Sequence, residues 1–147
     1  MPQRNDLVLT GHEPDSRATI NMIIGLGVDQ IEIARVEHSW KRFGDRFGRR
    51  VFTPQEWRYC LSRPHPAQSM AGRFAAKEAA MKALGLGWPG GIAFRQIEVT
   101  RESTGRPRLR LSGVAAQRAA SMGVKSMSIS MTHDRTYSSA TVVFERD

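Results

Sequence analysis

The sequence predicts an α+β fold in which an antiparallel sheet packs against helices, one of them long and central. Three observations lead to this prediction. A run of strong helix formers extends over residues 67–84. Short segments with strand-like patterns fill most of the chain after residue 91. The length of 147 residues suits one domain, which we expect over residues 22–147.

The first expected elements begin at residue 22. The apolar run at 22–28, MIIGLGV, predicts a strand whose glycines allow another backbone to come close. A helical spacing then relates three apolar residues, Ile33, Val36 and Trp40. We expect two later glycines, Gly44 and Gly48, to divide that helix into shorter pieces.

A further helix is predicted to start at Thr53 and to run to about Ser62. Threonine is a favoured N-cap, and Pro54 suits the first helical position. Glu56 stands where a capping box needs its acidic residue.

The long helix at 67–84 has unusual faces. Glu78 and Lys82 are four positions apart and share one face, and Arg73 and Lys77 share another. Between the charged faces lies a bulky apolar strip formed by Met70, Phe74 and Met81. The opposite side is a stripe of small residues, formed by Gly72, Ala76, Ala79 and Ala83. We expect the small stripe to pack closely against a neighbour, and the bulky strip to lie in the core or at a subunit contact.

The second half of the chain predicts strands around one short helix. Glycines at 85 and 87 are expected to end the long helix. Strands are then predicted at 91–100 and 106–112, a helix within 113–123, and a hairpin of two strands around the Asp-Arg pair at 134–135. Residues 1–21 are polar without periodicity, and we interpret them as a flexible N-terminal extension or as upstream sequence.

The net charge of +8 and a pI of about 10.7 should attract polyanions such as nucleic acid, phosphorylated cofactors, an acidic protein or anionic lipid. No apolar run approaches the ~20 residues of a membrane span, and no known nucleic-acid-binding motif occurs. We therefore expect neither a membrane nor nucleic acid as partner. The single cysteine, Cys60, suits a reducing compartment, and we expect a cytoplasmic protein.

Asp29 and Glu78 are the candidate metal ligands. A carboxylate after a glycine-rich strand and one from a central helix resemble a sparse Mg²⁺ site, which takes one or two carboxylates and completes its shell with water and substrate phosphate. Two simpler roles stay open at this point. Asp29 could cap a helix, and Glu78 with Lys82 could form an exposed ion pair worth about 0.3–0.5 kcal/mol. His133, taken alone, is more often a surface or hydrogen-bonded loop histidine than a ligand.

Six segments in order resemble holo-acyl-carrier-protein synthase, the bacterial group of the 4′-phosphopantetheinyl transferases: GLGVDQIEIARVE, RVFTPQEW, AGRFAAKEAAMKALGLG, FRQIEV, TGRPRLRL and SISMTH…YSSATVVFE. The resemblance covers about residues 22–145, and FAAKEA at this distance after GVD is its most specific part. It implies the 4′-phosphopantetheinyl transferase fold and a homotrimer with active sites at subunit interfaces. Gln30 departs from the family pattern, where an aliphatic residue is more usual.

The resemblance also implies an activity and its residues. The family transfers 4′-phosphopantetheine from coenzyme A to a serine of apo-acyl carrier protein, releases adenosine 3′,5′-bisphosphate, requires Mg²⁺ and supports fatty acid biosynthesis. The matching positions are the metal ligands Asp29 and Glu78, the catalytic pair Glu78 and Lys82, the cofactor-binding residues Arg73, Lys77, Lys82 and His133, and the carrier-protein-binding residues Arg35, Arg42 and Arg46. The general base is not fixed by the resemblance, and Glu78 is our candidate.

Two other function classes are considered. A basic nucleic-acid-binding domain is supported by charge alone. A catalytically inactive scaffold subunit is disfavoured, because both carboxylates and both lysines of the long helix and its partner strand are present.

Overall fold

The computed structural model describes residues 20–85 and 91–147. The elements in chain order are β1 (Met22–Glu32), α1 (Ile33–Phe43), α2 (Asp45–Val51), α3 (Pro54–Ser62), α4 (Pro66–Leu84), the 3₁₀ helix η2 (Phe94–Gln96), β2 (Ile97–Arg101), β3 (Pro107–Leu111), α5 (Gly113–Met122), β4 (Ser126–His133) and β5 (Tyr137–Arg146). The predicted extension lies outside the described residues except for its last two positions, as does Gly87.

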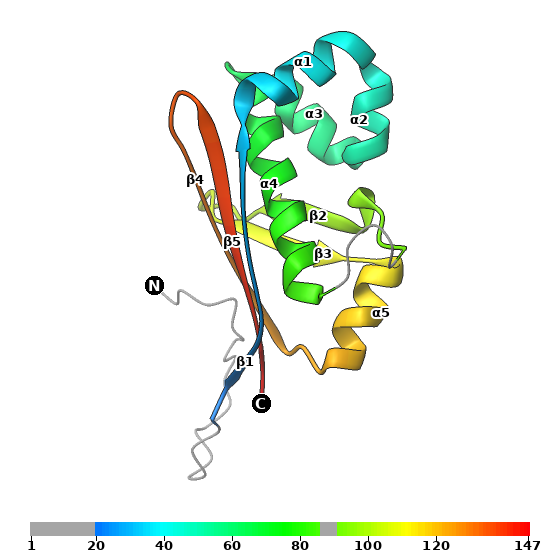
Figure 1. Ribbon diagram of the computed structural model, residues 1–147, viewed down its shortest axis with the longest axis vertical. Coiled ribbons are helices and arrows are strands. Elements are labelled where there is room, and N and C mark those ends of the chain that lie inside the picture. The colour runs from blue at the N-terminus through cyan, green and yellow to red at the C-terminus, as the bar shows by residue number, and fades with distance from the viewer. Residues whose placement is uncertain (1–19, 86–90) are drawn as a thin grey trace.

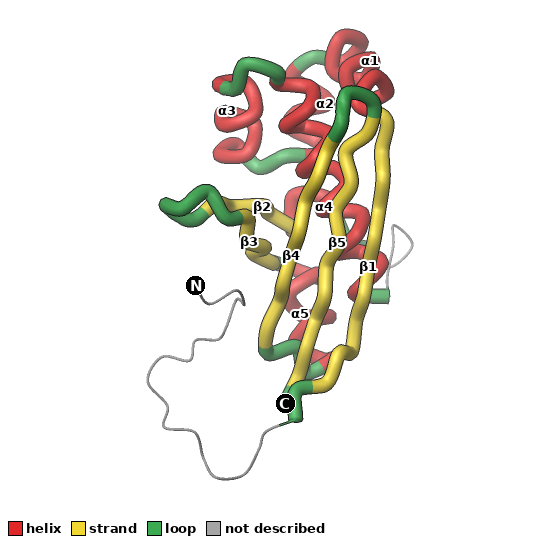
Figure 2. The backbone as a smooth tube through the Cα atoms, turned by 90° about the vertical axis from the view of Figure 1, so that its left-hand side faces the viewer, coloured by secondary structure: helices red, strands yellow, loops and turns green. Residues whose placement is uncertain are grey.

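A three-stranded antiparallel sheet, in the order β1-β5-β4, forms one layer, and α4 runs along one of its faces (Figure 1). Strands β2 and β3 form a separate antiparallel hairpin (Figure 2). The predicted α+β class with a long central helix is therefore confirmed, whereas the expectation of one sheet is wrong. The second hairpin packs beside α4 instead of extending the large sheet.

Helix α4 and strand β1 approach each other through small residues on both sides. A Cβ atom on Gly27 would lie 1.8 Å from the carbonyl oxygen of Ala79, and one on Gly25 would lie 2.4 Å from that of Ala83. No residue with a side chain fits at either glycine without separating strand and helix. The small stripe of α4 and the glycines of the GLGVD segment are thus two halves of one contact, as their sequences predict.

The predicted helix caps are confirmed. Thr53 Oγ1 accepts a hydrogen bond from the backbone of Glu56, and the Glu56 carboxylate accepts one from the Thr53 backbone. Gly85 ends α4 with a left-handed backbone, at φ 70°. The predicted bulky strip lies partly in the core, since Met70 and Met81 are buried, and Phe74 packs against Phe94.

Two local predictions are wrong. Gly48 lies inside α2 rather than between helices, and its lack of a side chain lets the indole of Trp57 pack against that helix. Residues 91–96 do not begin a strand. They include the turn of η2, and β2 starts only at Ile97.

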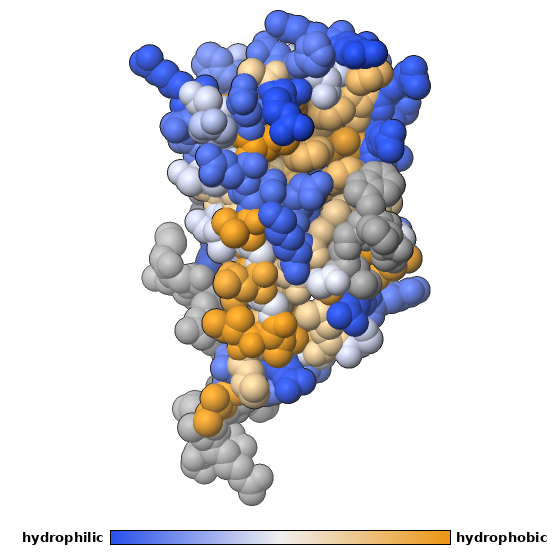
Figure 3. Space-filling model, viewed as in Figure 1, coloured by the Kyte–Doolittle hydropathy of each residue, from blue (hydrophilic) through white to orange (hydrophobic). Residues whose placement is uncertain are grey.

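One face of the large sheet is not covered by any other described element. Every second residue of β5 from Ser138 to Phe144 is buried on the α4 side, whereas Leu26 and Val28 of β1 point the other way and remain 64 % and 59 % exposed. Apolar side chains gather over the lower part of β1 in the space-filling view (Figure 3). This uncovered apolar face is a feature that a partner subunit could bury.

Candidate active site

Asp29 and Glu78 lie together, although 49 positions separate them in the sequence. Asp29 comes from β1 and Glu78 from α4, and both line a hollow of about 360 Å³ that also receives Arg35 from α1. The close contact between β1 and α4 through Gly25 and Gly27 brings the two carboxylates together. Asp29 lies within a strand, so the alternative that it caps a helix does not hold.

Glu78 is a partly buried carboxylate beside a second one, Asp29. The pKa of Glu78 is raised above its ordinary value, mainly because burial disfavours its charged form and secondarily because Asp29 repels it. Lys82 acts in the opposite direction. Its Nζ atom lies 3.2 Å from Asp29 Oδ1 and donates a hydrogen bond of 2.8 Å to the carbonyl oxygen of Val28. Lys82 thus pairs with Asp29, rather than with Glu78 as its helical spacing suggested.

The donor chemistry of this hollow fits a hard divalent cation. It offers two carboxylates whose mutual repulsion a cation would relieve, and it is open enough to leave room for water and phosphate oxygens. Among the described residues, no group of three or more acidic, histidine or cysteine side chains could hold a metal. The arrangement therefore suits Mg²⁺ rather than a closed site made only of protein ligands.

Arg73 and His133 line a second hollow, of about 380 Å³, on the other flank of α4. Arg73 is 2 % exposed, and its guanidinium carbon lies 4.1 Å from the ring centre of Tyr59. Its Nε atom and the buried Ser138 Oγ have no hydrogen-bond partner among the described residues. The ring of His133 hydrogen-bonds the side-chain amide of Gln68. Buried, unpartnered polar atoms beside a cationic hollow suit an anionic ligand.

Sequence reasoning missed several members of this second hollow. Arg63 and Arg101 also face the Tyr59 ring, with guanidinium carbons 5.6 Å and 5.5 Å from its centre. They come from the end of α3 and from β2, and Ser138 comes from β5. No periodic pattern links three such elements, and only the motif of α4 pointed to this region.

The two hollows share no lining residue. Asp29 is on the edge strand β1 and His133 on the opposite edge strand β4, with β5 between them (Figure 2). Arg73 and Glu78 are five positions apart on α4, which turns their side chains by roughly 140° around its axis. One chain therefore carries a carboxylate hollow on one flank of α4 and a cationic hollow on the other.

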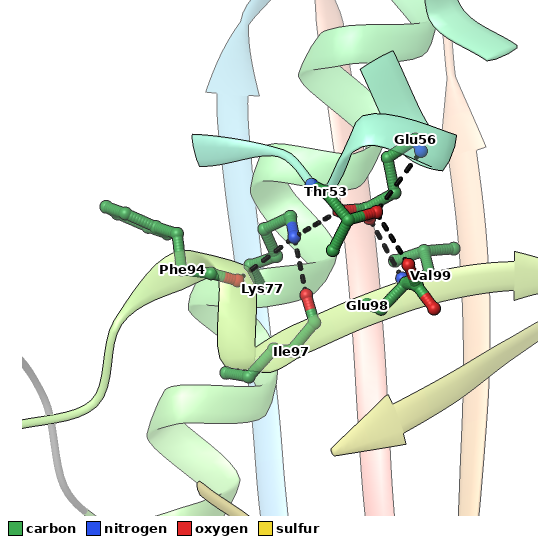
Figure 4. Close-up of polar contacts among 7 residues, drawn as sticks. All are labelled: Thr53, Glu56, Lys77, Phe94, Ile97, Glu98 and Val99. Atoms are coloured by element: carbon green, nitrogen blue, oxygen red, sulfur yellow. Dashed lines mark hydrogen bonds and ion pairs between the residues drawn. The ribbon is translucent and has the colours of Figure 1, made fainter. Parts of the chain in front are cut away.

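Lys77 does not line either hollow. Its ammonium is fully buried and donates to Glu56 Oε1 at 2.7 Å and to the carbonyl oxygens of Phe94 and Ile97 (Figure 4). All three of its N–H groups have protein acceptors, and burial lowers its pKa. Lys77 therefore has no N–H group left for a cofactor phosphate, although its match to the family motif suggested one. It links α4 to α3 and β2 instead.

The three residues matched to carrier-protein binding lie on α1 and α2, and all are exposed. Arg35 reaches the carboxylate hollow. Arg46 borders an adjoining hollow of about 500 Å³, which is lined by the rings of Phe43, Phe47 and others and reaches Glu78. Arg42 lies farther along α1, over the ring of Phe43. A cationic rim around apolar side chains thus borders the Glu78 side of the site.

Comparison with known proteins agrees with this geometry. The family described as the 4′-phosphopantetheinyl transferase superfamily matches residues 25–142. A holo-[acyl-carrier-protein] synthase of Koribacter versatilis is 46 % identical over 124 residues, which cover 84 % of this chain and 99 % of that protein. The crystal structure of the synthase from Neisseria meningitidis superposes with a TM-score of 0.78 at 33 % identity, covering 85 % of this chain and 100 % of that one.

A further solved structure, the synthase of Helicobacter pylori in complex with coenzyme A, has a TM-score of 0.72 at 33 % identity and covers 81 % of this chain and 98 % of its own. The chain therefore belongs to the 4′-phosphopantetheinyl transferase superfamily. In the described part of the chain, no helix has both the length and the hydropathy that crossing a bilayer requires.

Proposed function

We propose that the chain transfers the 4′-phosphopantetheine group of coenzyme A to a serine hydroxyl of apo-acyl carrier protein and releases adenosine 3′,5′-bisphosphate. The observation that carries this proposal is the pairing of Asp29 and Glu78 in one open hollow, in a chain that belongs to this transferase superfamily. The names of its relatives, and the coenzyme A bound in the Helicobacter pylori structure, support the same substrates.

In the reaction the serine oxygen forms a bond to the β-phosphorus of coenzyme A, and the bond from that phosphorus to the bridging oxygen breaks. The chain's main task is to hold the two substrates in line and to balance charge. Glu78 accepts the hydroxyl proton, directly or through water. The Lys82 ammonium balances charge on the phosphate oxygens. Mg²⁺, held by Asp29 and Glu78, would add electrostatic stabilisation of the leaving bisphosphate.

Arg73 and His133 are proposed to bind phosphate groups of coenzyme A, together with Arg63 and Arg101. Their hollow faces away from Glu78 in the same chain. One cofactor can therefore meet both sets if the carboxylates of one subunit face the arginines of a neighbour. A homotrimer with sites at its interfaces provides this arrangement, and the uncovered apolar face around Leu26 and Val28 supplies a surface for its assembly.

The carrier protein is proposed to bind over α1 and α2. The exposed guanidinium groups of Arg35, Arg42 and Arg46 suit an acidic partner, and the phenylalanines beside Arg46 suit its apolar side chains. The product would supply carrier protein for fatty acid biosynthesis. A cytoplasmic location is in keeping with the single, unpaired thiol of Cys60.

The direct test is to incubate the protein with apo-carrier protein, coenzyme A and Mg²⁺ and to weigh the carrier protein. A gain of one phosphopantetheine group is expected. Asp29→Asn and Glu78→Gln should each lower the rate by at least about 100-fold with the fold intact. Glu102→Gln, at a carboxylate outside both hollows, is the matched control and should leave the rate unchanged. A carrier protein of unchanged mass would refute the activity. Unaltered rates in the two variants at limiting Mg²⁺ would refute the ligands.

A further inference from the structure

Lys82 is the ion-pair partner of Asp29, one of the two carboxylates that line the hollow. Its Nζ lies 3.2 Å from Asp29 Oδ1 and is anchored at 2.8 Å by the carbonyl oxygen of Val28. The Asp29 side chain is 18 % exposed, whereas that of Lys82 is 54 % exposed. The carboxylate is therefore held in place by its surroundings, and the ammonium lies at the end of a stem that solvent allows to move.

Lys82 does not line the hollow, but its ammonium pairs with Asp29 and acts on the charge of Glu78, and these contacts define two states of Lys82. With no cofactor, the ammonium is the counter-ion of Asp29, and a divalent cation placed between Asp29 and Glu78 is repelled by it. With a pyrophosphate in the hollow, Lys82 has a doubly charged acceptor in reach, which competes with the single carboxylate. Turning toward the phosphate removes the ammonium from Asp29 and leaves the carboxylate for the metal.

We propose that Lys82 couples metal binding to cofactor binding: its ammonium opposes the divalent cation while coenzyme A is absent, and releases Asp29 when the pyrophosphate is bound. The proposal rests on the proposed function of this site. It differs from a role as phosphate contact alone, because a residue that only contacts phosphate has no effect on metal affinity in the absence of cofactor. By thermodynamic reciprocity, metal and cofactor then strengthen each other's binding by the same factor.

The test measures the affinity of the full chain for Mn²⁺ by electron paramagnetic resonance, with and without coenzyme A, in the absence of carrier protein. Lys82→Met is expected to bind Mn²⁺ alone about 10-fold more tightly than the natural sequence, and to show a coupling factor between Mn²⁺ and coenzyme A that is smaller by about the same factor. Lys82→Arg keeps the charge and should retain weak binding of Mn²⁺ alone.

Lys41→Met is the matched control. Lys41 forms an ion pair of the same length, 3.2 Å, with Glu37, which does not line the carboxylate hollow, whereas Asp29 does. The Lys41→Met substitution removes the same charge from the protein as Lys82→Met and should leave Mn²⁺ binding unchanged.

The outcomes separate the two hypotheses. If the natural sequence binds Mn²⁺ and coenzyme A but Lys82→Met leaves the Mn²⁺ affinity and the coupling factor unchanged, the inference about Lys82 is wrong and the proposed function stands. If Lys41→Met tightens Mn²⁺ binding as much as Lys82→Met does, the effect is one of net charge, and the inference is equally wrong. If the natural sequence binds neither ligand, both the proposed function and the inference fail.

Discussion

Lys77 Nζ lies 2.7 Å from Glu56 Oε1, and the two side chains are 0 % and 1 % exposed. The second oxygen of Glu56 accepts the backbone N–H of Val99 at 2.9 Å. Thr53, which shares the capping box with Glu56, donates its hydroxyl to Glu98 at 2.6 Å (Figure 4). One buried ion pair thus joins α4, α3 and β2. A buried pair whose remaining hydrogen-bonding atoms have partners fixes the relative position of its elements, whatever its net energy.

Removing one member of this pair should be severely destabilising. Lys77→Met leaves the Glu56 carboxylate buried without a cation, and the free energy of unfolding is expected to fall by about 3–5 kcal/mol. Replacing both residues, as Lys77→Met with Glu56→Leu, should recover part of this loss. Lys41→Met, at the exposed pair with Glu37, should change stability by less than about 0.5 kcal/mol. Urea denaturation of the four proteins measures these differences. Equal, small effects at Lys77 and Lys41 would show that the buried pair does not hold these elements together.

The contact between β1 and α4 predicts opposite outcomes at two glycines. Gly27→Ala would place a Cβ atom 1.8 Å from a backbone oxygen of α4, and stability should fall by at least about 3 kcal/mol. Gly72→Ala is the matched control inside α4. Its Cβ would meet only the terminal methyl group of Met131, at 3.0 Å, and the gain in helix propensity is up to about 1 kcal/mol. Thermal unfolding compares the two variants, and a similar loss in both would contradict the close strand–helix contact.

Much of this fold follows from local signals in the sequence. The capping box at Thr53 and the glycine at the end of α4 are set by steric and hydrogen-bonding needs within a few residues. The small residues of β1 and of α4 each indicate a close neighbour, but not which segment that neighbour is. The pairing of Asp29 with Glu78 was also predictable, because a family motif supplied the long-range link that periodicity lacks.

The role of Lys77 was not predictable in this way. Its spacing from Arg73 placed both on one helical face, and the family resemblance implied cofactor binding for both, but the Lys77 ammonium donates to Glu56 of α3. Arg101 was missed for the same physical reason, because β2 brings it to the Tyr59 ring on α3 and strand periodicity contains no information on that contact. Arg63 follows Tyr59 by four positions at the end of α3, a spacing that brings the two side chains together but does not indicate a ligand.

The raised pKa of Glu78 predicts that the metal-free protein loses stability as the pH rises. The folded protein holds the Glu78 proton to higher pH than the unfolded chain, so stability falls as pH rises from the ordinary value of 4.5 through the raised value. Glu78→Gln removes this cost. With a chelator present, the variant should match the natural sequence at pH 4 and be more stable at pH 7, by less than about 1 kcal/mol because the side chain is partly exposed to solvent. Urea titrations at the two pH values measure the difference, and a variant less stable at pH 7 would contradict the assigned shift.

Cys60 should be unreactive in the folded protein. Its thiol is buried, and burial raises its pKa to about 11, so little thiolate exists at pH 8. Reaction with an aromatic disulfide reagent at pH 8 is expected to be at least about 100-fold slower in native protein than in guanidinium chloride. Stopped-flow absorbance gives both rates. Comparable rates would mean that the helix carrying Cys60 opens readily.

The opposite placement of Arg73 and Glu78 on α4 predicts that two inactive variants restore each other. Arg73→Ala and Glu78→Gln should each be nearly inactive alone. In the proposed homotrimer, co-expression in equal amounts would give interfaces where an intact Glu78 of one subunit faces an intact Arg73 of the next. In such a mixture one interface in four is of this kind, so about a quarter of the natural activity should return. The carrier-protein mass assay measures it, with a mixture of Asp29→Asn and Glu78→Gln as the control, because those two changes affect the same half of the site. Activity no higher in the first mixture than in the control would mean that each site is built within a single chain.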